Sequence, residues 1–373
     1  ETPHHRRGEE IAGWGATVRE IDVLAPLFNS VVHLAPLYEG PAPASAQPYR
    51  SGLVTLRALE PAGGSGVRAK LGLLARIPAY WRALWRELGR CDVVHVRTPA
   101  NICLLALVAL TLRRRPRRRW LKFAGNWNPQ GPYPWSYRLQ RFWLRKGWAR
   151  GWVTVNGRWP GQPPWVRSFD NPSLDAAEEA AAAAAAETKA TPPPLRLLFV
   201  GALVTTKGMA TALRAAAYAR QEGLDLTFDI VGDGPERANF EALARDLGLS
   251  DVARFHGWVP RDDIGPFYAA AHLFLLPSHS EGWPKVVSEA MAHGAVPLVS
   301  SVSCIPQVLG ECGAGETYPF DDAEAFGRGI LAYAADAERW RRESRAGGQA
   351  AHRFTYAHYL DRVRALLSNS PQP

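Results

Sequence analysis

The sequence of 373 residues is poor in cysteine, with only four, at positions 91, 103, 304 and 312. None of them forms a C-x-x-C pair, and their spacing fits no zinc module. The simplest interpretation is a reduced protein of the cytoplasm. We expect it to use no metal and no other cofactor.

Long apolar runs are also missing. No segment reaches the ~18–20 continuous apolar residues of a membrane span. The best candidate, 102–112, is too short and is predicted to be a buried helix. No secretory signal is visible, but the sequence begins at Glu1 without Met, so this absence is weak evidence.

Lysine is scarce, because only six of the 44 basic residues are Lys and the rest are Arg. The net charge of +9 favours acidic partners such as nucleoside diphosphates, anionic lipid surfaces or nucleic acid. Arginine suits bidentate phosphate binding. A GC-rich genome explains the Arg and Ala content more simply.

The length and the apolar fraction of 47% allow two domains with substantial cores. The second half alternates short apolar runs with amphipathic segments, which predicts an α/β domain with a parallel sheet. The first half has a similar but less regular pattern. The predicted strands are 31–37, 53–59, 92–97, 119–124, 153–156, 195–200, 226–231, 253–257, 273–276 and 296–299. The predicted helices are 17–28, 70–88, 99–112, 209–221, 236–247, 264–271, 285–293 and 356–367.

The segment 175–194 has seven consecutive Ala residues and ends in Thr-Pro-Pro-Pro. Such a composition is typical of a linker, or of a short helix followed by a stiff spacer. We expect the domain boundary there. The predicted domains are 1–174, the linker 175–194, a second domain 195–352 and a terminal helix 353–373.

The most informative motif is Glu281-Gly-Trp-Pro-Lys-Val-Val-Ser-Glu289, which lies between two predicted strands. Pro284 suits the start of a helix and Gly294 its end. Glu281 is therefore expected just before the helix, and Glu289 inside it. A helix start between two carboxylates suits a diphosphate flanked by hydroxyl-bearing rings, although two solvent-facing glutamates would also explain the pattern.

Three other loops follow predicted parallel strands and are expected at the same sheet edge, where open α/β sheets bind ligands. The first carries Gly201 and Lys207 but fits neither a Walker loop nor G-x-G-x-x-G. The second carries Gly232. The third carries Trp258 and Val259, which would line a base pocket.

Taken in chain order, these three loops and the E-x7-E motif resemble the C-terminal half of the retaining GT-B glycosyltransferases. The resemblance is to the group 1 enzymes, which are similar to glycosyltransferase family 4. The resemblance covers 195 to about 367. It implies two Rossmann-like domains with parallel sheets facing a cleft, and a C-terminal helix that crosses back to the N-domain. It also implies transfer of a sugar from a nucleoside-diphosphate sugar, with UDP or GDP as the nucleotide, to a glycan or lipid-linked acceptor in bacterial polysaccharide biosynthesis.

The resemblance also implies roles for single residues. Glu281 would contact the donor sugar, Glu289 the ribose, and Lys207 the diphosphate. Backbone N–H groups around Gly282, Trp283 and Pro284 would help Lys207.

The first half departs from the family pattern, and a first strand is expected to precede Glu1. Ala202 stands where the family has Arg. His95 matches a frequent His position, but a core histidine is slightly favoured. Asn126 is equally well explained as a sugar ligand or as a turn residue. His4 and His5 are expected to be exposed.

Two segments are both basic and aromatic. Six Arg occur between 113 and 119, and the segment 138–152 alternates Arg and Lys with Phe and Trp. Peripheral attachment to the anionic inner face of a membrane explains this pattern, and so does a solvated loop with a half-buried helix. Nucleic-acid binding ranks last, because no recognisable motif accompanies the Arg run.

Two further alternatives remain open. A sugar-nucleotide epimerase shares the expected architecture but would need acid and base groups that the sequence does not reveal. A non-catalytic nucleotide-sugar-binding protein would explain Ala202 and the turn 124–126, which reads Ala-Gly-Asn where the family often has a His.

Overall fold

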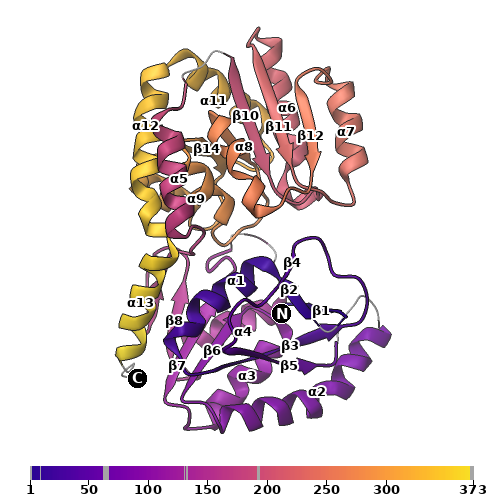
Figure 1. Cartoon of the computed structure of the whole chain (residues 1–373), viewed down its shortest axis with the longest axis vertical. Coiled ribbons are helices and arrows are strands. Elements are labelled where there is room, and N and C mark those ends of the chain that lie inside the picture. The colour runs from indigo at the N-terminus through magenta and orange to yellow at the C-terminus, as the bar shows by residue number, and fades with distance from the viewer. Residues whose placement is uncertain are drawn as a thin grey trace. The chain divides into compact units, whose positions relative to one another are not determined.

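The computed structural model describes residues 2–8, 10–61, 67–129, 131, 133–190 and 194–369. The chain forms two compact units, labelled by element in Figure 1. Unit 1 comprises Glu1–Phe169 and Leu360–Pro373, and unit 2 comprises Asp170–Tyr359. The chain therefore passes from unit 1 to unit 2 at Phe169, before the segment predicted as a linker.

That segment contains a helix of unit 2, α5 (Ala176–Glu187). A capping box starts it: the Asp175 carboxylate accepts from the Glu178 N–H at 2.9 Å, and the Asp175 N–H donates to Glu178 Oε2 at 2.7 Å. Alanine has the highest helix propensity, so the Ala run continues this well-capped start. Ala182 is fully buried, which shows that the helix packs into unit 2.

Unit 2 contains a parallel sheet of six strands in the order β12-β11-β10-β13-β14-β15. The chain starts in the middle, adds two strands on one side, and then adds three on the other. The order reverses between β10 and β13, which is where ligands bind in doubly wound folds. The strands are β10 (Leu195–Val200), β11 (Leu226–Val231), β12 (Ala253–Gly257), β13 (Leu273–Leu276), β14 (Val296–Ser300) and β15 (Glu316–Tyr318).

Helices cover this sheet. The first four agree with the predicted segments to within one or two residues, and the last three were not predicted. Two of those three start at an aspartate that caps the helix: Asp322 accepts from the Ala325 N–H, and Asp336 from the Arg339 N–H. The seven helices are α6 (Met209–Gln221), α7 (Arg237–Asp246), α8 (Gly265–Ala270), α9 (Lys285–Ala292), α10 (Ile305–Cys312), α11 (Ala323–Ala335) and α12 (Ala337–Ala350).

Unit 1 has two sheets among its described residues, in the orders β4-β2-β1-β3-β5 and β6-β7-β8-β9. The second sheet is parallel throughout, and β1 and β5 run parallel to β3. The strands are β1 (His4–Arg7), β2 (Glu10–Trp14), β3 (Val31–Tyr38), β4 (Ala46–Pro48), β5 (Val54–Leu59), β6 (Val93–Thr98), β7 (Arg118–Phe123), β8 (Trp152–Val155) and β9 (Val166–Ser168).

The helices of unit 1 include the buried segment expected at 102–112, which is part of α3. This unit has α1 (Gly15–Leu24), α2 (Val67–Leu88), α3 (Asn101–Leu112) and α4 (Trp135–Arg145). The terminal helix α13 (Tyr356–Ser368) begins in unit 2 and continues into unit 1. In the described part of the chain, no helix has both the length and the apolar character needed to cross a bilayer.

The start of the chain differs from the expectation. His4 lies in β1, beside β3, and its side chain is fully buried rather than exposed. Its ring Nε2 lies 2.8 Å from the Tyr49 hydroxyl, and His33 Nδ1 lies 2.5 Å from the same hydroxyl. Periodicity could not reveal this, because the pairing partners are separated from His4 by whole elements.

Unit 1 also contains a buried ion cluster. Glu20 of α1 accepts from Lys122 Nζ at 2.6 Å and from Arg97 Nη1 at 2.8 Å. Glu20 and Lys122 are almost completely buried. Burial, opposed by the charge of Glu20, lowers the pKa of Lys122 to about 8. The cluster ties α1 to the ends of β6 and β7.

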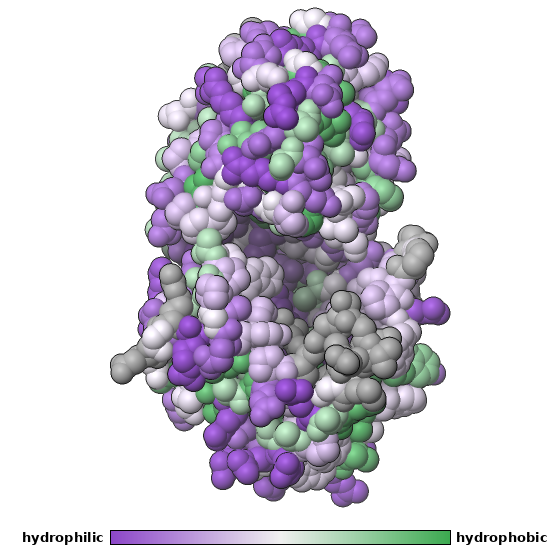
Figure 2. All heavy atoms as spheres, turned by 90° about the vertical axis from the view of Figure 1, so that its right-hand side faces the viewer, coloured by the Kyte–Doolittle hydropathy of each residue, from purple (hydrophilic) through white to green (hydrophobic). Residues whose placement is uncertain are grey.

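The surface of unit 2 differs in character from its interior. Figure 2 shows the side that carries α7, where hydrophilic residues cover most of the surface and hydrophobic residues are scattered. The sheet strands β10, β13 and β14 are almost entirely buried. Unit 2 therefore has the layered arrangement expected of a parallel sheet.

We expect unit 2 to lose stability in acid because of His272, which is 4% exposed. Its Nδ1 accepts from the Arg196 N–H at 3.0 Å, so Nε2 carries the hydrogen that points to Ala190 O. Burial lowers the pKa of His272 to about 4. The unfolded chain takes up this proton near pH 6.5, so the free energy of unfolding falls as the pH drops from 6.5 to 4, by on the order of 2–3 kcal/mol.

His272→Asn keeps an acceptor for the Arg196 N–H but cannot titrate. We expect urea denaturation at pH 7 and pH 5 to show a smaller loss of stability in this variant than in the wild type. His352→Asn, at an exposed position of the same unit, is the control and should leave the loss unchanged. Equal losses in all three proteins would show that His272 does not cause the acid lability.

Candidate active site

The loops that follow β10 and β13 touch each other at the point where the strand order reverses. Gly208 has φ +75°, and a Cβ at this position would lie 1.9 Å from Pro277 O. The His279 N–H donates to Thr206 O at 3.0 Å. Only glycine permits this approach, which brings the two loops into register.

The approach pairs two residues that the resemblance assigns to different parts of the donor, the diphosphate and the sugar. Lys207 Nζ donates to Glu281 Oε1 at 2.5 Å. The Lys207 side chain is 32% exposed and that of Glu281 is 12% exposed, so solvent still reaches the cation. An accessible ammonium group at this edge of a parallel sheet is suited to a phosphate.

Helix α9 starts directly after this pair, at Lys285. Pro284 is the N-cap residue, one position before the predicted first turn, and its carbonyl accepts from the Val287 N–H at 3.1 Å. The helix ends at Ala292, and Gly294 has φ +73° as expected for a helix terminus. The N–H groups and the dipole of the first turn favour an anion at this place.

The loops after β10 and β11 and the end of β12 also contact one another. Gly232 has φ +137°, and a Cβ there would lie 1.9 Å from Gly201 O. The Gly232 N–H donates to Gly257 O at 2.8 Å. These contacts bring together the loops after β10, β11 and β12. Trp258, which is 45% exposed, and the half-buried Val259 follow directly.

Glu289 lies in the second turn of α9 and is only 5% exposed. Both of its oxygens are engaged: Oε1 accepts from Arg261 Nη1 at 2.8 Å, and Oε2 accepts from the Tyr268 hydroxyl at 2.9 Å. Arg261 also donates to Glu178 Oε1 at 2.8 Å and to Ser173 O. The carboxylate is therefore held in one orientation by two donors.

The electrostatics of this cluster keep its members in fixed protonation states. Burial opposes the charge on Arg261, but the carboxylates of Glu289 and Glu178 hold its pKa above the ordinary value. Burial and the negative charge of Glu289 raise the pKa of Tyr268. Arg261 stays cationic and Tyr268 stays a donor, so Glu289 faces two permanent donors.

Arg261 and Tyr268 were not singled out from the sequence. Arg261 follows β12 on the same sheet edge as Trp258, and this position was the available signal. Tyr268 lies in α8 and gave no signal, because an aromatic residue in an amphipathic helix is typical of a core. The pairing with Glu289 depends on tertiary structure.

Two residues of the motif pack against their surroundings. The buried Trp283 donates from Nε1 to the Ser288 hydroxyl at 2.8 Å and stacks on Phe354 with ring centroids 5.1 Å apart. The Gly282 carbonyl accepts from the Cys304 thiol at 3.3 Å. Trp283 therefore fixes the turn before α9, and its indole N–H is already used.

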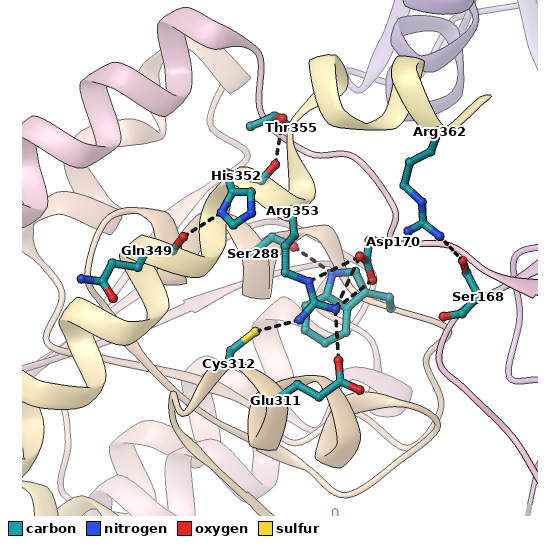
Figure 3. Close-up of polar contacts among 11 residues, drawn as sticks. Ser168, Asp170, Ser288, Glu311, Cys312, Gln349, His352, Arg353, Thr355 and Arg362 are labelled. Atoms are coloured by element: carbon teal, nitrogen blue, oxygen red, sulfur yellow. Dashed lines mark hydrogen bonds and ion pairs between the residues drawn. The ribbon is translucent and has the colours of Figure 1, made fainter. Parts of the chain in front are cut away.

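A second arginine holds the segment next to Phe354. Figure 3 shows Arg353 between three groups of unit 2. Its guanidinium lies 3.5 Å from Asp170, 3.2 Å from Glu311 and 3.6 Å from the Cys312 sulfur. This cluster anchors the stretch on which Trp283 stacks, and so supports the turn that carries Glu281.

The predicted residues of unit 1 have less specific surroundings. His95 is exposed, and its Nδ1 lies 3.2 Å from Trp120 O. Asn126 Oδ1 accepts from the Asn128 N–H at 3.0 Å, the contact expected of a turn-forming Asn. Among the described residues of unit 1, no contact marks either residue as a ligand. Within the described ranges, no group of three or more His, Cys, Asp or Glu side chains is placed to hold a metal ion.

Residues 183–350 match the family model of the glycosyl transferases group 1. The chain carries a group 1 glycosyltransferase domain. This domain contains the paired loops, Lys207, Glu281 and Glu289. The match confirms the resemblance inferred from the motifs.

Curated relatives match part of the chain. The lipopolysaccharide core biosynthesis glycosyltransferase LpsE of Rhizobium meliloti is 36% identical over 177 residues, which are 47% of this chain and 50% of LpsE. The 2-deoxystreptamine glucosyltransferase of Streptomyces kanamyceticus is 35% identical over 113 residues, 30% of this chain and 29% of the relative. The matches thus span half of these relatives or less.

Solved structures match over both units. Sucrose-phosphate synthase from Thermosynechococcus elongatus has a TM-score of 0.70 at 19% identity, covering 94% of this chain and 91% of that one. Anabaena HepE, solved in complex with UDP, has a TM-score of 0.70 at 16% identity, covering 95% and 96%. At these identities the likeness establishes the fold, which is the GT-B fold of two Rossmann-like domains.

The buried network around Glu289 predicts a graded loss of stability. Arg261→Met leaves Glu289 and Glu178 without their cation, and removing one partner of a buried ion pair costs about 3–5 kcal/mol. Tyr268→Phe removes a single bond to a charged acceptor and costs about 1.5–3 kcal/mol. Arg328→Met, which breaks an exposed pair with Glu324, is the control and should change little.

Urea unfolding followed by circular dichroism measures this order. If Arg261→Met unfolds at the same urea concentration as Arg328→Met, the network around Glu289 does not stabilise the protein.

Proposed function

We propose that the protein is a retaining glycosyltransferase that moves a sugar from a nucleoside-diphosphate sugar to a glycan or lipid-linked acceptor. The proposal is supported above all by the contact between Lys207 and Glu281. This contact lies where the strand order of the unit 2 sheet reverses, beside the start of α9. A cation beside the start of a helix favours a diphosphate. A carboxylate next to them favours sugar hydroxyls.

Each group of the site receives a role. Lys207 and the first-turn N–H groups of α9 neutralise the diphosphate, and Glu281 accepts from the hydroxyls of the donor sugar. Glu289 accepts from the ribose through the lone pairs that Arg261 and Tyr268 leave free, because a carboxylate offers about four acceptor sites. Gly201, Gly232 and Gly282 let the backbone approach the nucleotide, and Trp258 and Val259 line the base.

The chemistry is electrostatic. As the bond between the sugar and the diphosphate breaks, negative charge grows on the leaving group, and Lys207 with the helix start stabilises it. The acceptor hydroxyl attacks from the side of the leaving group and gives its proton to the departing diphosphate oxygen, which preserves the anomeric configuration. In the ligand-free site the salt bridge with Glu281 orients Lys207. When the donor binds, its diphosphate becomes the partner of the Lys207 ammonium group.

Similar proteins support a UDP donor and a glycan acceptor. UDP is preferred over GDP, since HepE was solved with UDP. A glycan acceptor is supported by LpsE, whose printed name is a lipopolysaccharide core biosynthesis glycosyltransferase. We place the activity in the cytoplasm at the inner face of an anionic membrane, where a lipid-linked acceptor is available. His95 and Asn126 are proposed to contact the acceptor.

Lys207→Ala tests the proposed charge neutralisation. Losing one such contact costs about 2–4 kcal/mol of barrier, so we expect turnover to fall about a hundredfold. Release of UDP from UDP-sugars measures the rate. Arg214→Ala, which removes an exposed cation from α6 of the same unit, should leave the rate unchanged. A Lys207→Ala enzyme with normal turnover contradicts the assignment.

Glu289→Gln tests the ribose contact and the donor class together. In the wild type, UDP at a hundred times its Kd should stabilise the protein by about 2.7 kcal/mol, while GDP should do less. The variant should lose most of this stabilisation, because its amide supplies only one acceptor oxygen. Thermal shift measurements of the wild type and the variant, each with UDP, with GDP and without ligand, test the ribose contact and the donor class. Equal shifts in both proteins exclude the ribose contact.

A further inference from the structure

One part of unit 1 carries charge of a single sign. Residues 93–169 contain thirteen Arg and two Lys but no Asp or Glu. Eight of the fourteen Trp residues lie in the same stretch. The segment contains no carboxylate, so any counter-charge for its arginines comes from outside it, as Glu20 does for Arg97.

Helix α4 presents two different faces. Its inner face is occupied: Leu144 is fully buried, and the Gln140 amide bonds to both the N–H and the carbonyl of Ala100. Its outer face is exposed, with Trp135 at 72% and Phe142 at 46% exposed. These two aromatic residues are seven positions apart and therefore lie on the same side of the helix, two turns apart.

The arginine-rich loop that follows α3 lies beside α4 and the turn after it. Trp143 of α4 donates to the Thr111 hydroxyl at the end of α3 at 2.9 Å. The buried Arg119 donates to Pro116 O in the loop at 2.7 Å and to Ala149 O in the turn at 2.8 Å. The neighbouring Leu112 is 66% exposed.

These contacts define one surface, the α3–α4 face, made of the exposed side chains Leu112, Arg114, Arg117, Phe142, Lys146 and Trp148. Phe142 and Trp148 meet edge to face with ring centroids 5.5 Å apart, and Lys146 Nζ lies 5.7 Å from the Phe142 ring. Apolar and cationic groups therefore alternate on this surface. The buried Arg119 holds the loop after α3 and the turn after α4 together beneath it.

We propose that the α3–α4 face docks on an anionic membrane surface. Aromatic rings and a leucine suit the boundary between headgroups and acyl chains, and the surrounding cations suit the negative headgroups. A nucleic acid would use the cations but would leave Leu112 without a function. Only the purpose of this docking rests on the proposed function: docking would hold the enzyme where a lipid-linked acceptor is found.

Co-sedimentation with vesicles tests the proposal, using phosphatidylcholine vesicles with and without about one third phosphatidylglycerol. The wild type should bind only the anionic vesicles. Arg114→Gln with Arg117→Gln should weaken binding about 25-fold, since each charge contributes about fivefold. Phe142→Ser with Trp148→Ser should also weaken binding, and the loss should persist at high salt, because it is not electrostatic.

The matched control is Arg214→Gln with Arg245→Gln, which removes the same charge from exposed positions on α6 and α7 of unit 2. It should bind vesicles like the wild type. Equal losses in the control and the α3–α4 variant would mean that net charge alone drives binding, and would overturn the proposal.

Two further outcomes also overturn it: no binding to anionic vesicles at low salt, or tighter binding of single-stranded RNA through the same residues at physiological salt. UDP release by each variant in vesicle-free solution should equal that of the wild type. This measurement separates failure of membrane docking from failure of the proposed transferase activity.

Discussion

The close packing of Gly208 against Pro277 is the constraint on which the unit 2 site depends. A side chain at position 208 would overlap the carbonyl of Pro277, so the loops after β10 and β13 meet only because this residue is glycine. The parallel sheet brings both loops to one edge, at the point where the strand order reverses. The salt bridge between Lys207 and Glu281 is a direct result of these two features.

The second glutamate of the motif is controlled differently. Glu281 lies in a loop and is partly accessible, whereas Glu289 is buried between Arg261 and Tyr268. An ionised carboxylate in such a place is stable only with strong donors. The chain supplies these donors from the segments before and within α8, and Glu178 of α5 pairs with the same Arg261 guanidinium. One rigid network therefore connects α5, α8 and α9.

The sequence predicted much of unit 2, because its buried parallel strands are continuous apolar runs and the loops after them carry the glycines. For the segment of α5 the sequence left a linker and a short helix open, because an Ala run suits both; the capping box of Asp175 and Glu178 favours the helix. The buried position of His4 depends on Tyr49 and His33, which no local pattern connects to it. Likewise, the spacing of Glu281 and Glu289 predicted a pair, but the Arg261 partner of Glu289 arises only from tertiary packing.

A crystal structure of the protein with bound UDP tests the central claim most directly. The account predicts the diphosphate within hydrogen-bond distance of Lys207 Nζ and of the first-turn N–H groups of α9, with the ribose hydroxyls directed at Glu289. Density for UDP at any other place, with Lys207 still paired to Glu281, would contradict it.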